Sequence, residues 1–176
     1  MHRIIAALAL CGSAVLCGCG SSGNSSGPKS PANVTGSWTY TASDLSGDGY
    51  TCTVTGAILT LEQTDTTFAG TYADALLSCT SGSTTINNPG LSGDIVNGTV
   101  SGSSVSFEID GATYTNTGSV SGTTMSGTAS LSTAGSGTNI TVTGSWTAAQ
   151  QSTTATVPPT RRGPTISAAL HAIRGS

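Results

Sequence analysis

The chain has 176 residues and a formal charge of −3, and only 7% of its residues are charged. All eight Asp and Glu residues lie within 33–149, a segment with no Lys, Arg or His, so its formal charge is −8. We therefore expect no binding to nucleic acid, because no cation is present there to neutralise phosphate. Without a histidine the segment cannot form a Ser-His-Asp triad, and we predict no enzyme activity, no cofactor and no metal site.

The first residues have the pattern of an export signal. A cationic start precedes an apolar run over 4–16 that is too short to span a bilayer as a helix. The run ends in Leu16-Cys17-Gly18-Cys19, which resembles the lipobox of bacterial lipoproteins. The resemblance implies that a signal peptide over 1–18 is removed and that Cys19 carries the lipid. An ordinary secretory peptide with incidental cysteines is the alternative.

The same resemblance implies a location. In Gram-negative lipoproteins an aspartate after the lipidated cysteine retains the protein at the inner membrane, and this chain has Gly20 there. We therefore expect a lipid-anchored protein of the cell envelope, on the outer membrane if the host is Gram-negative. Residues 19–32 contain no large apolar side chain after Cys19, and we predict that they form a flexible tether between lipid and domain.

The domain over 33–149 is predicted to be all-β. Its apolar and polar side chains alternate, as in Ile140 and Val142 against Thr141 and Thr143, which is typical of half-buried antiparallel strands. Eight such strands joined in sequence order can close into an antiparallel up-and-down β-barrel, which leaves no exposed edge. The expected strands cover 34–42, 50–63, 67–76, 91–100, 104–110, 112–121, 124–132 and 138–147, with 77–87 as a candidate ninth strand.

Two local patterns predict details of this barrel. The apolar parity switches at Gly56, which indicates a bulge or a sharp bend. The pentapeptide Val34-Thr-Gly-Ser-Trp38 recurs as Val142-Thr-Gly-Ser-Trp146, so pairing of the first and last strands would place the two copies side by side. We therefore expect both tryptophans to point inward.

Two glycine–aromatic motifs support a more specific barrel type. Val34-Thr-Gly-Ser-Trp38 and Phe68-Ala-Gly-Thr-Tyr72 resemble the opening strands of the calycin barrels, the lipocalins and avidins. The Thr/Ser/Gly-rich strands over 33–149 also resemble those of small lipocalin-like bacterial lipoproteins. The resemblance implies a lipocalin-like barrel whose interior can hold a ligand.

Seven aromatic side chains have the parity of the barrel interior, and an eight-stranded barrel either fills with side chains or holds one small ligand. The leading hypothesis is a non-enzymatic, envelope-anchored lipoprotein whose partners are the membrane, through its lipid, and a small apolar ligand. The alternatives are a module that binds an envelope protein, such as a protease-inhibiting barrel, or a structural lipoprotein without a ligand. Six aromatic residues are the candidate lining of the cavity, namely Trp38, Tyr40, Tyr72, Phe107, Tyr114 and Trp146, and the seventh is Phe68.

Cysteines and acids are the remaining groups of the domain that could carry chemistry. Cys52 and Cys79 are its two cysteines, and in an oxidising compartment we expect a disulfide between them, with two buried thiols as the alternative. Glu108 and Asp110 share one parity of a strand but alternate with apolar residues, so we expect both on the solvent face. The acidic stretch 44–49 lacks the ligands of a calcium loop and is predicted to be a hairpin turn.

The segment 150–176 differs in composition from the domain. It begins as a polar linker with Pro158-Pro159 and carries three arginines. We predict a disordered basic tail that can include a short helix, and the alternatives are a helix docked on the acidic barrel or one in contact with the membrane. Four apolar residues fall on one helical face, namely Ile166, Ala169, Leu170 and Ile173.

Overall fold

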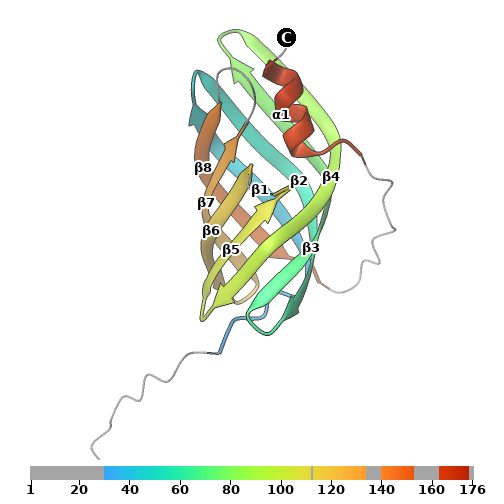
Figure 1. Cartoon of the computed structure of the whole chain (residues 1–176), viewed down its shortest axis with the longest axis vertical. Helices are drawn as coiled ribbons and strands as arrows, with labels where there is room; N and C mark the ends of the chain where they lie inside the picture. The colour runs from blue at the N-terminus through green and yellow to red at the C-terminus, as the bar shows by residue number, and fades with distance from the viewer. Residues whose placement is uncertain (1–29, 112, 134–139, 153–162, 175–176) are drawn as a thin grey trace, which may run out of the picture.

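The computed structural model describes residues 30–111, 113–133, 140–152 and 163–174. These residues form a closed barrel of eight antiparallel strands in sequence order, with one short helix at one end (Figure 1). Because the first strand pairs with the last, the wall has no unpaired edge. The elements are β1 (Gly36–Gly47), β2 (Tyr50–Thr64), β3 (Thr67–Ser81), β4 (Thr84–Ser101), β5 (Ser104–Ile109), β6 (Tyr114–Ser121), β7 (Thr124–Ser132), β8 (Thr141–Gln150) and α1 (Ile166–Arg174).

The alternation in the sequence sorts side chains between the two faces of the wall. In β8, Val142 and Trp146 are buried, whereas the intervening Thr143 and Ser145 are exposed. Apolar residues from every strand meet in one core inside the barrel, and hydroxyl side chains cover the outside. The prediction of an eight-stranded up-and-down barrel is therefore confirmed.

The bend expected at Gly56 is a β-bulge. Tyr40 of β1 lies opposite Ala57 of β2, but Ala42 lies opposite Val54, so β2 has one residue more than β1 between these pairs. Gly56 has a φ of +72°, a conformation that glycine adopts without steric cost. The extra residue explains why the apolar parity switches here.

The stretch 77–87 does not form a ninth strand. Its residues extend β3 and β4 into a long hairpin, in which Cys79 lies opposite Ile86 and Gly82 makes the turn with a φ of +58°. The prediction was wrong because a turn inside a Thr/Ser-rich stretch gives little signal when strands continue on both sides. This hairpin projects at the end of the barrel where α1 lies (Figure 1).

The twin pentapeptides lie on paired strands, but they are not side by side. Trp38 of β1 lies opposite Gln150, and Trp146 of β8 lies opposite Ala42. The closing register is set by the tilt and stagger of the strands around the barrel, which a local repeat does not determine. Both indoles are nevertheless inward and buried, as expected.

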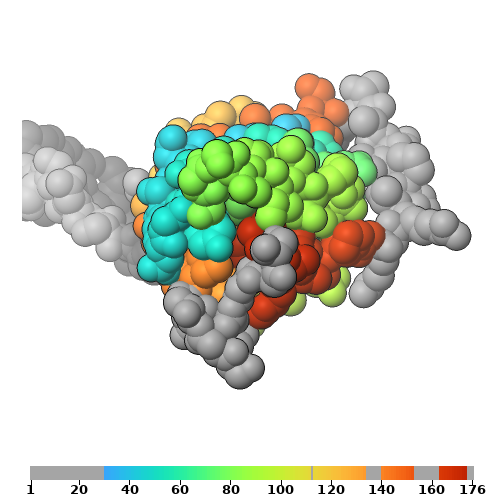
Figure 2. All heavy atoms as spheres, turned by 90° about the horizontal axis from the view of Figure 1, so that it is seen from above, coloured from blue at the N-terminus to red at the C-terminus, as the bar shows by residue number. Residues whose placement is uncertain are grey.

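Each end of the barrel is covered by a segment that is not part of the wall. At what we call the N-terminal end, the backbone nitrogen of Ala32 donates to the Gly102 carbonyl at 2.7 Å, and Val34 is fully buried. At the opposite end, the α1 end, the helix packs against β3 and β4. Figure 2 shows α1 lying across this end beside the β3–β4 hairpin.

Residues 163–174 therefore adopt the docked-helix alternative for the tail. All four apolar residues of the helical face are buried against the barrel. Residues 153–162 and 175–176 lie outside the described residues, so the rest of the tail prediction stays a prediction. A helix of nine residues is marginal alone in water, so docking on the barrel is what stabilises α1.

Candidate functional site

The aromatic residues of the candidate cavity are all buried, but they do not share one lining. Three rings meet in the middle of the barrel, where Trp146 stacks on Tyr40 with centroids 5.8 Å apart and meets Phe107 edge-on at 5.3 Å. Phe107 in turn contacts Phe68, with centroids 5.9 Å apart. Of the two alternatives for the interior, the described side chains therefore favour a filled barrel in this section.

The remaining candidates lie elsewhere in the barrel. Trp38 belongs to the N-terminal end, because its indole nitrogen donates to the Val34 carbonyl at 2.9 Å. Tyr72 belongs to the α1 end, where its hydroxyl donates to Asp110 Oδ2 at 2.7 Å. Tyr114 is the first residue of β6, next to the α1 end, and its hydroxyl bonds to that of Tyr40. The six residues thus split into two end closures and a central group.

Two glycines make room for the central indole. Trp146, Gly127 and Gly118 lie opposite one another on β8, β7 and β6. The indole nitrogen of Trp146 reaches across this row and donates to the Thr117 carbonyl at 3.1 Å. A Cβ at Gly127 would overlap the Thr117 carbonyl, because the strands approach closely at this point. The interior glycines therefore serve packing here and do not leave an open cavity.

A chain of buried hydroxyls runs beside this aromatic group. The Tyr114 and Tyr40 hydroxyls are 2.7 Å apart, and the Tyr40 hydroxyl donates to Asn116 Oδ1 at 2.8 Å. Burial raises the pKa of both tyrosines, and the Tyr114 contact raises the pKa of Tyr40 further. Both phenols are thus neutral hydrogen-bonding groups at any ordinary pH.

Asn116 is a site residue that the sequence reasoning missed. It is 1% exposed, and its Nδ2 atom has no hydrogen-bond partner among the residues that the structure describes. The available signal was an asparagine at inward parity on β6, two residues after Tyr114. Buried polar groups in proteins are almost always paired, so this nitrogen is a candidate contact for a further molecule.

Asp110 connects the barrel wall to the helix. Its Oδ2 accepts from the Tyr72 hydroxyl and, at 3.1 Å, from the backbone nitrogen of Ile166. The nitrogen of Ser167 lies 3.5 Å from the same oxygen. A carboxylate is stabilising at a helix N-terminus, where backbone N–H groups are unpaired. Burial raises the pKa of Asp110, and the hydrogen bonds from Tyr72 and the backbone oppose that rise.

The expectation that Glu108 and Asp110 share the solvent face is wrong for Asp110. Glu108 does lie outside, where it accepts from the Asn97 amide at 2.8 Å. Strand β5 ends at Ile109, and Asp110 has a φ of +55°, so the strand alternation no longer applies to it. Its carboxylate therefore turns to Tyr72 and α1, and the two acids form no catalytic pair.

Most acidic residues of the domain have a conformational role. Asparagine and aspartate tolerate the left-handed region better than other non-glycine residues, which suits turns and bulges. The acidic stretch 44–49 spans the β1–β2 hairpin, as predicted. Among the described residues, no group of three or more His, Cys, Asp or Glu could hold a metal ion. The acids with left-handed φ angles are Asp44, Asp48, Asp65, Asp74 and Asp110.

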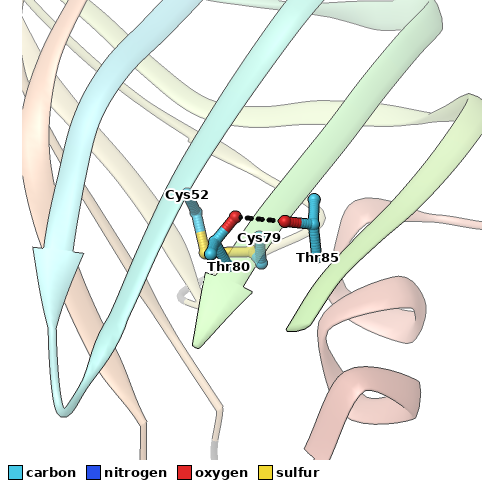
Figure 3. Close-up of a disulfide and its surroundings, with 4 residues drawn as sticks. All are labelled: Cys52, Cys79, Thr80 and Thr85. Carbon is cyan, nitrogen blue, oxygen red and sulfur yellow. Dashed lines mark hydrogen bonds between the residues drawn. A yellow bond between two sulfur atoms is a disulfide. The ribbon is translucent and has the colours of Figure 1, made fainter. Parts of the chain in front are cut away.

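The predicted disulfide is present between β2 and β3. Cys52 and Cys79 lie directly opposite each other, with an S–S distance of 2.04 Å (Figure 3). Both are buried, and next to them Thr80 and Thr85 share a hydrogen bond of 2.8 Å between β3 and β4. The disulfide therefore fastens the wall near the α1 end.

A shallow groove opens beside the disulfide. It has a volume of about 200 Å³ and lies between the β3–β4 hairpin and the last turn of α1. Its apolar lining residues are Tyr50, Ile86 and Ile173, and its polar lining includes Ser81 and Thr84. Of its apolar residues, Tyr50 and Ile86 are partly exposed, whereas Ile173 is buried.

Cys19 lies outside the described residues. Within the part of the chain that is described, no helix has the length and apolar character needed to cross a membrane. No family model, curated protein or solved structure matches this chain. The resemblance to bacterial lipoproteins and lipocalins therefore stays a prediction, and function has to be argued from the site itself.

Proposed function

We propose that this protein is a non-enzymatic lipoprotein of the cell envelope that is anchored through Cys19 and binds a small apolar molecule in its barrel. The observation that carries this proposal is the arrangement of the two ends. The segment that leads back to Cys19 reaches the barrel at the N-terminal end, whereas α1 covers the opposite end (Figure 1). A lipid on Cys19 would thus leave the α1 end facing away from the membrane.

The length of the tether is compatible with this orientation. Residues 20–32 contain no large apolar side chain, and a flexible chain of that length would separate its ends by about 20 Å. That distance would hold the N-terminal end just clear of lipid headgroups. The acidic wall, which has no Lys, Arg or His between 33 and 149, would be repelled by anionic headgroups, so the lipid supplies the attachment.

The side-chain chemistry of the barrel supports a binding role over a catalytic one. Burial raises the pKa of Tyr40, Tyr72 and Tyr114, so none of them is a base near neutral pH. The half-buried Asp110 is engaged by Tyr72 and the start of α1. An apolar interior with a few convergent polar groups is the usual form of a site for a small molecule.

The α1 end is the natural entrance to that interior. The apolar face of α1 sits on the barrel through four side chains, and displacement of this face would uncover the apolar core beneath. Because the central rings contact one another, the ligand has to be small. The ligand would compete with α1 for the same apolar surface.

A protein-binding role is the second candidate, and the groove beside α1 favours it. Tyr50, Ile86 and Ile173 offer a partner protein a small apolar contact there. A protease-inhibiting barrel would need an N-terminal segment that projects into a cleft, whereas the described residues 32–34 pack on the barrel. The small-molecule proposal is therefore the better supported of the two.

The anchor is tested by lipid labelling. Cells that express the full chain are grown with radioactive palmitate, and we expect label on the wild type and on Cys17→Ala but not on Cys19→Ala. The unlabelled variant should also leave the membrane fraction. Equal labelling of Cys19→Ala and wild type would contradict the anchor.

Ligand binding is tested by native mass spectrometry of the full chain purified from its own host in mild detergent. We expect a fraction of the protein to carry a small-molecule adduct that is lost after unfolding and refolding. A Leu170→Ala variant, with a weakened α1 contact, should take up a fluorescent apolar probe faster than wild type. Absence of both adduct and probe uptake would contradict small-molecule binding and leave the protein-binding module and the structural lipoprotein as the remaining functions.

A further inference from the structure

Asn116 ends a hydrogen-bonded chain, and its amide nitrogen is a donor without a partner in the described part of the chain. The Tyr40 hydroxyl donates to its Oδ1, and the Tyr114 hydroxyl lies within hydrogen-bond distance of Tyr40. The residue is only 1% exposed, and no described residue accepts a hydrogen bond from its buried Nδ2 atom. An unpaired buried donor is costly to the fold, so an amide kept there needs an acceptor.

The neighbours of Asn116 in the wall do not supply this acceptor. Phe107 on β5 and Ala129 on β7 lie directly opposite it, and both side chains are apolar. Along β6 the inward positions on either side are Tyr114, whose hydroxyl is bonded to Tyr40, and Gly118. The acceptor therefore has to come from a molecule that is not part of the wall.

Asn116 is close to the α1 end of the barrel. Thr113, just before β6, has its Oγ1 2.6 Å from the Ser167 hydroxyl of α1. Asn116 is the second inward residue of β6, so it lies about 7 Å further along the strand than Tyr114, the first. A molecule that reaches Nδ2 thus lies one layer of side chains below the helix.

We propose that Asn116 Nδ2 anchors an internal site that takes one neutral oxygen acceptor. The oxygen comes from a buried water or from the carbonyl or hydroxyl group of a small apolar molecule. A carboxylate is disfavoured because residues 33–149 contain no cation to pair with it. A ligand as the source of the oxygen rests on the proposed function, whereas a buried water does not.

The occupant is detected by NMR on the full chain in detergent, with asparagine side chains labelled with ¹⁵N. The Asn116 amide signal is assigned by its loss in Asn116→Leu. After refolding in buffer alone, we expect cross-relaxation between this amide and a water held for longer than a nanosecond. In protein from its own host, a ligand oxygen would replace that water contact with one to ligand protons.

Native mass spectrometry separates the two sources. A ligand held by Asn116 gives an adduct that falls at least tenfold in Asn116→Leu and persists in Asn87→Leu, the same substitution at an exposed position of β4. If Asn116→Leu does not fold, Tyr40→Phe is measured instead. This variant keeps the Asn116 amide, so the contact between that amide and the occupant should remain.

The results of these experiments distinguish a failure of the Asn116 site from a failure of the proposed function. An adduct that is equally abundant in Asn116→Leu and wild type overturns the anchor but leaves ligand binding in place. An Asn116 amide with contact to neither water nor ligand overturns the inference altogether. The lipid-labelling result at Cys19 affects neither conclusion.

Discussion

The two ends of the barrel are closed by different structures. At the N-terminal end an extended segment inserts Val34 into the core, and the Val34 backbone is held by Gln63 at 2.8 Å and by the Trp38 indole at 2.9 Å. At the α1 end a helix lies on the rim and is held by an apolar face and by Asp110. The closure at the N-terminal end runs directly into strand β1. The closure at the α1 end begins at Gly163, which is 13 residues after Gln150, the last residue of β8.

This difference predicts that the ends open by different processes. Opening the N-terminal end removes Trp38 and Val34 from the core, so it should occur only when the barrel unfolds. Undocking α1 leaves all eight strands paired, so it is a local opening of lower free energy. We therefore regard the α1 end as the entrance and the N-terminal end as a fixed base.

The largest expected effect is at the base. Trp38→Ala removes a fully buried ring and leaves the Val34 carbonyl without its donor, which should lower the free energy of unfolding by about 3–5 kcal/mol. Thr39→Ala, at the next, outward position, removes one exposed hydrogen bond from Gln151 and should change it by about 1 kcal/mol or less. Equal urea midpoints for the two variants would show that the base does not depend on Trp38.

The disulfide is expected to stabilise the α1 end of the wall. Replacing Cys52 and Cys79 together by alanine should lower the free energy of unfolding by about 3–4 kcal/mol, because the unfolded chain regains the freedom of a long loop. Denaturant unfolding of oxidised protein, reduced protein and the double variant measures this loss. Iodoacetamide should modify neither cysteine in unfolded, unreduced protein, and modification of both would contradict the disulfide.

Weakening the helix face should open the α1 end alone. Leu170→Ala removes the centre of the docked face and should weaken docking by about 2 kcal/mol or more. Amide exchange within α1 should become at least about 30-fold faster, while the strands keep their protection. The control is Ala172→Ser, an exposed position of the same helix. Faster exchange throughout the strands would mean that the two ends are not independent.

Asp110 is expected to contribute less than the apolar face. Asp110→Ala leaves the Tyr72 hydroxyl without its acceptor and removes one of the two acceptors of the Ile166 amide, the other being the Tyr72 hydroxyl at 2.9 Å, which should weaken α1 docking by about 1–3 kcal/mol. Asp110→Asn keeps an acceptor and a residue that tolerates a positive φ, so its effect should be smaller. The rate of proteolysis of α1 measures both variants, and identical cleavage of Asp110→Ala and wild type would show that Asp110 does not hold the helix.

The smallest effect is on pH dependence. Burial raises the pKa of Asp110 in the folded protein above its ordinary value of 3.8, so the folded state binds the proton more tightly than the unfolded state. The contribution of Asp110 to stability is then full below 3.8 and falls as the pH rises through the raised value. Urea unfolding between about pH 3 and pH 7 should show this fall in wild type but not in Asp110→Asn. A contribution of Asp110 to stability that rises with pH would contradict this prediction.

The barrel could be predicted from the sequence because a period of two marks the inner face of every strand. Trp38 and Trp146 were therefore placed inward correctly, although their mutual register was not. The register follows from the stagger of the whole barrel, which no local pattern contains. The bulge at Gly56 was predictable because a shift of parity is itself a local signal.

The site was less predictable because its polar members depart from the patterns. Asp110 leaves the alternation through a left-handed φ at the end of β5, and its partners are far away in sequence. Asn116 keeps the inward parity but is the wrong residue type for it, which is a signal that can be read only once the barrel is known. The periodicity of 166–173 predicts a helix, whereas its docking depends on tertiary contacts.

Native-state hydrogen exchange of the full chain is the most direct test of the difference between the ends. We expect the amides of α1 to exchange by local opening, well before those of 32–35, which should exchange together with β1 in global unfolding. If α1 exchanged only in step with β1, or if 32–35 opened first, the assignment of the α1 end as the entrance would be contradicted.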